Sequence, residues 1–161
     1  MNQDMSVVCG EGILNIRVGA IIIQDGKILM VSNDCVDYYY SIGGRIKMGE
    51  TAQEAIVREV YEETGYTMNI NHLGFIHENY FYGDSTSNKE ALIYEISFYF
   101  IMNVPPEFHP ITQSTTEDHD QETYSWIDPH TSATIYPEFF KTHELIHSHG
   151  VIHLCTDQRK R

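Results

Sequence analysis

The stretch GRIKMGETAQEAIVREVYEETGY, Gly44 to Tyr66, carries a well-marked helix pattern. Thr51 with Glu54 three residues later forms a capping box, and Gly65 supplies the glycine that commonly ends a helix. The apolar stripe between these ends consists of Ala55, Ile56, Val57 and Val60. The pattern therefore predicts a helix over residues 52–64.

Three glutamates, Glu59, Glu62 and Glu63, fall within an arc of roughly 100° on that helix. Each like-charge pair at this spacing costs about 0.2–0.5 kcal/mol, and each acid in the last turn opposes the helix dipole by about 0.3–1 kcal/mol. A bound Mg²⁺ or Mn²⁺ would reverse both effects, because these ions prefer carboxylate oxygens. The spacing is compatible with a metal site, but for three glutamates taken alone a solvated acidic face is the favoured interpretation.

The surrounding residues favour the metal site. Residues 44–66 resemble the Nudix box, Gly-x5-Glu-x7-Arg-Glu-(apolar)-x-Glu-Glu-x-Gly-(apolar). The matching positions are Gly44, Glu50, Arg58, Glu59, Val60, Glu62, Glu63 and Gly65. A chance match in a chain of this size is on the order of 10⁻⁷ at average residue usage. Two positions depart from the usual pattern: Tyr66 replaces a smaller aliphatic residue, and Ile42 replaces the proline that often precedes the two glycines.

The resemblance extends beyond the box. RVGAIIIQDGKILMV before it and SWID after it are similar to the flanking segments of Nudix domains. It implies an α/β fold, an α/β/α sandwich around a central mixed β-sheet. We expect one domain over residues 1–161, with its core at about 13–156, since this length suits a single domain.

Carried over residue by residue, the resemblance implies a metal site. Glu59, Glu62 and Glu63 are the implied ligands of Mg²⁺ or Mn²⁺, and a backbone carbonyl near Gly43 or Gly44 is a further one. Such an ion neutralises phosphate oxygens and lowers the pKa of an attacking water. The three glutamates are therefore also the first candidates for catalysis.

Other residues have supporting or open roles. The resemblance implies that Glu50 and Arg58 hold the loop to the helix, while Gly44 and Gly65 shape its two ends. The resemblance implies that the general base comes either from the box or from the loop before the late tryptophan, which here is TEDHDQETYSW. Its loop candidates, for activating water or binding metal, are Asp120 and Glu122.

Substrate recognition is less determined by the sequence. The tyrosines that could stack on a base are Tyr38, Tyr40, Tyr80 and Tyr82, although aromatic residues on strands more often belong to the core. Tyr82 follows the end of the box by sixteen residues, similar to a tyrosine of some dinucleoside-polyphosphate hydrolases. The proline that marks many ADP-ribose hydrolases near that distance is absent. Neither cue decides the substrate.

Charge and cysteine content restrict the binding partners and the cellular compartment that we expect for this protein. The formal net charge of −13 argues against non-specific attraction to nucleic acids or anionic membranes. Cys9, Cys35 and Cys155 are scattered without CxxC spacing, which is typical of a reduced cytosol rather than a disulfide framework. No basic and apolar leader or run of about 20 apolar residues is present. We expect a cytoplasmic protein that does not bind membranes; a homodimer is compatible with the sequence.

The rest of the chain alternates strands and turns. Strand patterns occur in LNIRVGAIIIQ, in KILMVS after an Asp25-Gly26 turn, and in Tyr38 to Tyr40 ending at Gly43-Gly44. Two long antiparallel strands are expected in YTMNINHLGFIHENYFYG and ALIYEISFYFIMNV, and two short strands in ETYSWID and VIHLC. Residues 112–122 read as a loop. PEFFKTHELIHSHG predicts a second helix closed by Gly150.

The nine histidines invite a zinc interpretation, chiefly His143, His147 and His149. No HExxH motif or cysteine pair supports it, so we interpret them as solvated helix residues. The remaining positions are His72, His77, His109, His119, His130 and His153.

The functional expectation follows from the intact box. It is Mg²⁺-dependent hydrolysis of a diphosphate bond in a nucleoside diphosphate linked to another moiety, such as ADP-ribose, a dinucleoside polyphosphate or a (deoxy)nucleoside triphosphate. The alternative is a catalytically silent Nudix-fold module that senses a nucleotide or binds a protein. The retained acids argue against the alternative, because a pure sensor has no need of their mutual repulsion. The expected partner is a small-molecule nucleotide and not a nucleic acid.

Overall fold

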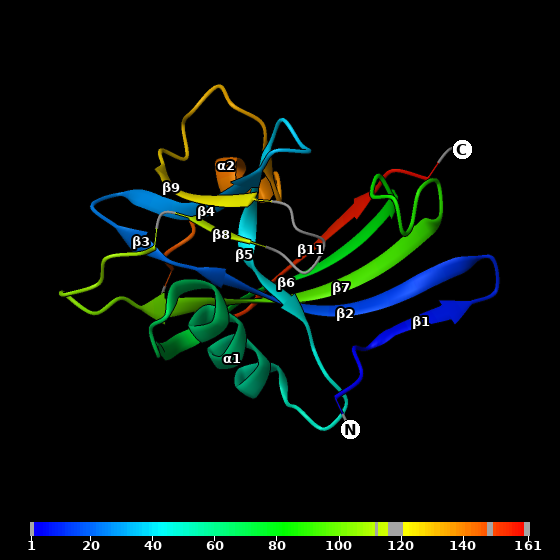
Figure 1. Ribbon diagram of the computed structural model, residues 1–161, viewed down its shortest axis with the longest axis horizontal. Coiled ribbons are helices and arrows are strands. Elements are labelled where there is room, and N and C mark those ends of the chain that lie inside the picture. The colour runs from blue at the N-terminus through cyan, green and yellow to red at the C-terminus, as the bar shows by residue number, and fades with distance from the viewer. Residues whose placement is uncertain (1, 112, 116–120, 148–149, 160–161) are drawn as a thin grey trace.

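A mixed β-sheet forms the centre of the protein, with helix α1 against one of its faces (Figure 1). The structure is a computed structural model and describes residues 2–111, 113–115, 121–147 and 150–159. The strands are β1 (Ser6–Cys9), β2 (Gly12–Ile21), β3 (Ile23–Gln24), β4 (Lys27–Asn33), β5 (Tyr39–Arg45), β6 (Asn69–Tyr82), β7 (Leu92–Asn103), β8 (Gln113–Thr115), β9 (Gln121–Ile127), β10 (Ile135–Tyr136) and β11 (Ile152–Asp157). The helices are α1 (Ala52–Thr64) and α2 (Phe139–Thr142).

The strand order confirms the expected mixed sheet. Neighbouring strands follow the order β11-β6-β7-β2-β5-β4-β9-β8, with β1 beside β2, β10 beside β5 and β3 beside β4. The β11/β6, β7/β2 and β10/β5 pairs are parallel, and the other pairs are antiparallel. The strand β2 is therefore shared: its first half pairs with β1, its second half with β5, and nearly its whole length with β7.

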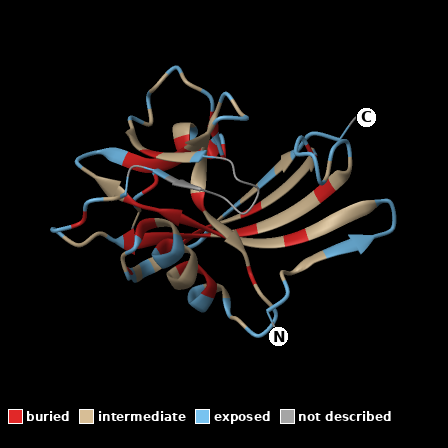
Figure 2. Ribbon diagram, viewed as in Figure 1, coloured by how far each residue is buried: buried red, intermediate tan, exposed pale blue. Residues whose placement is uncertain are grey.

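Alternating side chains give the sheet two separate cores. On β4, Leu29 and Val31 join one buried cluster, whereas Ile28 and Met30 join the other. The helix α1 packs on the first face, and α2 packs on the second. Figure 2 shows buried residues gathered where the strands pass behind α1, while the far arms of β2, β6 and β7 are largely intermediate. These arms hold the cleft described below.

The predicted helix is confirmed at both ends. The Oγ1 of Thr51 accepts a hydrogen bond from the Glu54 amide at 3.2 Å, and the Glu54 carboxylate accepts one from the Thr51 amide at 2.8 Å. At the other end, Gly65 has φ 76°, and its amide donates to the carbonyl of Tyr61 at 2.8 Å. Both caps satisfy backbone groups that a helix end leaves without partners.

The predicted second helix is wrong beyond its first turn. The helix α2 ends at Thr142, and His143 is extended with φ −122°. Phe140 and Leu145 are both buried in the second core. A continuous helix would separate these two residues by about 140° around its axis. One helical face therefore could not bury both, and the chain turns instead.

Most strand predictions are confirmed, with differences at β5, β1 and β8 and in the short strand β10, which was not predicted. The Asp25-Gly26 turn has φ 52° and 76°, as a tight hairpin requires. The strand predicted to end at Gly43-Gly44 continues through both glycines to Arg45. The hairpin strand β1 was not predicted, and β8 lies inside the predicted loop 112–122. Within the described ranges, no helix is long and apolar enough to span a membrane.

Candidate active site

The glutamate face of α1 meets β5 at its two glycines. The amide of Gly43 donates to Oε1 of Glu63 at 3.2 Å. A Cβ on Gly44 would lie 2.4–2.6 Å from the carboxyl atoms of Glu59, and a Cβ on Gly43 would lie 2.1 Å from the carbonyl oxygen of Val18. The missing side chain at Gly44 therefore lets the Glu59 carboxylate lie against β5, and the missing side chain at Gly43 lets β5 lie close to Val18 of β2.

Arg58 joins the loop that precedes α1 to the helix. Its guanidinium donates to both oxygens of Glu50, from Nε at 2.5 Å and from Nη2 at 2.9 Å. The Nη2 atom also donates to the carbonyl of Arg45 at 3.2 Å. The Nη1 atom donates to Glu59 at 2.7 Å and to Glu62 at 3.2 Å. Bidentate pairing of this kind fixes the orientation of both partners.

The carboxylates of Glu59, Glu63 and Glu122 repel one another, and those of Glu59 and Glu63 are partly shielded from solvent. Burial raises the pKa of Glu63 to about 8; the Gly43 amide opposes this, and the charges of Glu122 and Glu59 add to it. Burial also raises the pKa of Glu59, against the hydrogen bond from Arg58. These directions show that the carboxylates are close enough to interact.

The carboxylates of Glu59, Glu62 and Glu63 are chemically suited to bind a divalent cation, although they do not converge on one point in the structure. Among the described side chains, no three His, Cys, Asp or Glu form a group arranged to hold a metal. Arg58 draws Glu59 and Glu62 toward itself, while Glu63 lies against Gly43. Carboxylate oxygens are nevertheless the ligands that Mg²⁺ and Mn²⁺ prefer, and a cation would offset the repulsion that raises the pKa of Glu63.

The late loop brings one candidate base to this cluster. Glu122 is the second residue of β9, and its two oxygens accept hydrogen bonds from Tyr40 at 2.8 Å and Tyr124 at 3.2 Å. Its charge raises the pKa of Glu63, so the two carboxylates are neighbours. The other candidate, Asp120, lies outside the described residues. Tyr40, predicted to contact substrate, thus directs its hydroxyl to Glu122.

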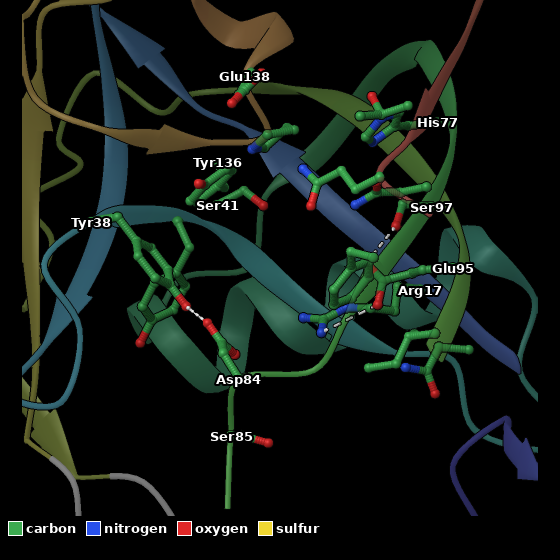
Figure 3. Close-up of a pocket in the computed structure, with 18 of the residues that line it drawn as sticks. Arg17, Tyr38, Ser41, His77, Asp84, Ser85, Glu95, Ser97, Tyr136 and Glu138 are labelled. Carbon is green, nitrogen blue, oxygen red and sulfur yellow. Dashed lines mark hydrogen bonds and ion pairs between the residues drawn. The ribbon is translucent and has the colours of Figure 1, made fainter. Parts of the chain in front are cut away.

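A cleft of about 510 Å³ opens on the α2 face beside this cluster (Figure 3). Tyr38, Tyr40 and Tyr82 line it. Tyr80 does not, because it projects from the opposite face of β6, where its ring stacks on Tyr94 at 4.4 Å. The volume is within the range of small-molecule pockets.

The cleft and the glutamates are adjacent but distinct. None of the three box glutamates lines the cleft. The two are connected through Tyr40, which donates to Glu122, and through Arg17, whose pKa is lowered by burial and raised more strongly by charges that include Glu59 and Glu63.

The floor of the cleft was missed by the sequence analysis. It is a set of inward-facing polar side chains on three neighbouring strands, here called the polar floor: Asn15, Arg17, His77, Asn79, Glu95 and Ser97. The available signal was polar residues at alternating positions inside otherwise apolar strands, as in LNIRVGAI and EISFYF. This pattern along each strand could not show that the three strands are neighbours in the sheet.

The histidine interpretation needs one correction. His143 and His147 are not on a helix, because α2 ends before them. The ring of His147 packs against Phe75 at 5.1 Å and His72 at 5.6 Å, so it is half-buried rather than solvated. His149 lies outside the described residues.

Known proteins resemble this chain in sequence and in fold. The model of the NUDIX domain matches residues 14–146. A protein of Methanocaldococcus jannaschii named ADP-ribose pyrophosphatase is 32% identical over 92 residues, which cover 55% of this chain and 50% of that protein. The chain spans half or less of the length of the curated relatives it matches.

Solved structures support the fold. A MutT protein of Bacillus halodurans has a TM-score of 0.61 at 17% identity, covering 80% of each chain. An ADP-ribose pyrophosphatase of Streptococcus suis has a TM-score of 0.55 at 15% identity, covering 86% of this chain and 98% of that one. The family-model match extends over most of the chain, and the box at its centre is intact. This chain therefore belongs to the Nudix hydrolase family.

Proposed function

We propose that this protein hydrolyses a diphosphate bond in a nucleoside diphosphate linked to another group, with Mg²⁺ or Mn²⁺ as its cofactor. The supporting observation is the cluster of Glu59, Glu63 and Glu122, which interact electrostatically beside a cleft large enough for such a substrate. Repelling carboxylates reduce stability in the absence of a cation, which is a reason to assign them a function.

The residues that would hold the cation are Glu59, Glu62 and Glu63, with the carbonyl of Gly43. When bound, such a cation supplies positive charge to phosphate oxygens and lowers the pKa of a nearby water. The protein's own contribution is positioning. Arg58 fixes Glu50 and the loop against α1, and Gly44 leaves space for the Glu59 carboxylate.

Glu122 is our candidate for accepting the proton of the attacking water. Tyr40 and Tyr124 hold its two oxygens, so its carboxylate has a defined position next to Glu63. The alternative assignments, Asp120 or a box glutamate, stay open as proposals. A general base works only when its oxygen is within hydrogen-bond reach of the proton it removes.

A panel of ADP-ribose, dinucleoside polyphosphates and (deoxy)nucleoside triphosphates tests the proposal, with Mg²⁺ or Mn²⁺ and with chelator. ADP-ribose is the first choice because relatives in sequence and in structure carry that name. We expect release of a nucleotide and a phosphorylated remainder, abolished by chelator. Replacing Glu63 by glutamine should reduce the rate at least about 100-fold, because it removes a charge that would bind the cation.

The matched control is Glu11→Gln, which removes a carboxylate on an exposed hairpin turn and should leave the rate unchanged. Turnover that persists at the wild-type rate in Glu63→Gln would contradict the assignment. Thermal stabilisation by a nucleotide, without product under either metal, would instead favour the silent sensor.

A further inference from the structure

Two half-buried histidines lie side by side next to the second core: His72 of β6 and His147 of the segment that follows α2. Their ring centres are 5.6 Å apart, and the ring planes are inclined at 81°. The ring of Phe75 lies 5.1 Å from that of His147, and along β6 Phe75 comes between His72 and His77. Neither His72 nor His147 lines the cleft. The pair is therefore a second cluster, outside the candidate active site.

An irregularity in β6 brings His72 to this face of the sheet. In a regular strand His72 and Phe75 would point to opposite faces, because they are three positions apart. The register of β6 with β7, however, skips Gly74. His72 and Phe75 consequently both lie opposite residues of the second core, which are Ile101 and Tyr99. Bulges of this kind commonly re-aim a side chain at a functional position.

The neighbours of His72 fix its tautomer. Its Nδ1 atom lies 2.6 Å from Oδ1 of Asn71, and the Asn71 amide is held in turn, because its Nδ2 donates to Oδ1 of Asn103 at 2.9 Å. An amide oxygen can only accept a hydrogen bond, so Nδ1 of a neutral His72 carries the proton and Nε2 has a free lone pair. Histidines that bind metals are commonly held in this way by a second residue.

Three ring nitrogens of the pair are buried without a hydrogen-bond partner within the described part of the chain. They are Nε2 of His72 and both nitrogens of His147. The His147 ring approaches the bulge closely, since a Cβ on Gly74 would lie 3.5 Å from its Nε2. A neutral His147 offers one lone pair, whichever nitrogen carries its proton. Burying these groups without partners is unfavourable, and a ligand that accepted both lone pairs would remove that cost.

The separation of the two rings suits one shared metal ion. With Zn–N bonds of about 2.0–2.1 Å, the centres of two imidazole rings on one tetrahedral zinc ion are about 5 Å apart. The observed 5.6 Å is close to that spacing. Imidazole nitrogen is a ligand for zinc, nickel and copper ions, whereas the carboxylates of α1 suit magnesium and manganese. The two clusters therefore differ in the metals that they favour.

Other described histidines near the pair have partners of their own. The Nε2 atom of His77 lies 2.8 Å from the hydroxyl of Thr156, and Nδ1 of His143 lies 2.9 Å from that of Thr142. Among the described side chains, no three His, Cys, Asp or Glu are grouped to hold a metal. The pair thus supplies two ligands, and water supplies the others.

We propose that His72 and His147 bind a divalent transition-metal ion, with Zn²⁺ as the first candidate, and that this ion ties the segment after α2 to β6. The inference goes beyond the proposed function and does not depend on it. Tyr136, Pro137 and Glu138, which precede α2, line the cleft. The ion therefore anchors the far end of a segment whose near end forms part of the cleft wall.

Calorimetric titration with Zn²⁺ tests the proposal in the presence of excess Mg²⁺, which suits oxygen ligands rather than imidazole. We expect Zn²⁺ at about ten times its dissociation constant to raise the melting temperature by at least about 2 °C. His72→Gln and His147→Gln should each weaken zinc binding at least about tenfold, because each removes one of two protein ligands. The matched control, His109→Gln, changes an exposed histidine and should leave the affinity unchanged.

Two substitutions of Asn71 test the geometry with both ligands in place. Asn71→Ala removes the acceptor that holds the Nδ1 proton of His72, and it should weaken zinc binding at least about tenfold. Asn71→Asp keeps an acceptor at the same position and should retain the wild-type affinity. A merely structural role of Asn71 would not separate these two variants in zinc affinity.

An absence of zinc binding by the wild type would overturn the proposal, as would an unchanged affinity in both histidine variants. Equal weakening in His109→Gln would assign the ion to exposed histidines and would also overturn it. Should a histidine variant fail to fold, the two Asn71 variants decide, because both ligands are intact in them. Glu63→Gln should retain the zinc site, so the proposed hydrolysis and the proposed zinc site fail through different results.

Discussion

Replacing Glu50 by glutamine tests how the box loop is held to α1. The hydrogen bonds from Arg58 lower the pKa of Glu50 from 4.5 to about 2. At about 1.36 kcal/mol per pKa unit, that lowering corresponds to an upper bound of about 3.4 kcal/mol. Solvent screens the pair, because both side chains keep 21% of their surface exposed. We therefore expect Glu50→Gln to reduce the free energy of unfolding by about 1–2 kcal/mol at pH 7.

The pH dependence gives the sharper test. A carboxylate with a depressed pKa stabilises the folded state above its unfolded pKa, and this stabilisation is lost as the pH falls toward the folded value. With pKa values of 4.5 and about 2, about a quarter of the contribution is lost by pH 4 and more than half by pH 3. The difference between wild type and Glu50→Gln should shrink accordingly in urea unfolding at pH 7, 4 and 3.

The control for this series is Glu11→Gln, which removes an exposed carboxylate and should change stability by less than about 0.5 kcal/mol. A difference between wild type and Glu50→Gln that is equally large at pH 7 and pH 3 would refute an ionic contribution. No destabilisation at pH 7 would show that the ion pair with Arg58 contributes nothing to folding.

Two further predictions concern the glycines of β5 and the polar floor. Gly44→Ala should be destabilised by less than about 1 kcal/mol, because only the flexible Glu59 carboxylate obstructs the new methyl group, yet its rate of catalysis should fall at least tenfold. In Gly43→Ala the new methyl group would meet the carbonyl oxygen of Val18 at 2.1 Å, and the backbone has φ 151°. This variant should lose more than about 2 kcal/mol of its free energy of unfolding in urea. Burial lowers the pKa of His77 to about 4, so the unfolded state binds more protons between pH 6.5 and 4. Stability should fall by up to about 2 kcal/mol from pH 7.5 to 5, and His77→Gln should flatten this slope; an unchanged slope in calorimetry would contradict the cause.

The helix and its acidic face were predictable from the sequence because their determinants are local. The Thr51 and Glu54 cap, the Gly65 stop and the glutamate spacing all lie within one segment, where helical geometry fixes which side chains are neighbours. The same reasoning failed for residues 143–147, which lie beyond the end of α2. There the helix pattern competed with burial of Leu145 in the second core, and burial prevailed.

The cleft required the tertiary structure. Tyr40 and Glu122 are 82 positions apart, and only the pairing of β4 with β5 and β9 brings them together. The polar floor likewise exists only because β2, β7 and β6 are neighbours in a particular register. A shift of one residue would turn their polar side chains to the opposite face. The sequence by itself determined the family and the acidic face of α1 that we propose as the metal site, whereas strand order and register decided which polar groups line the cleft.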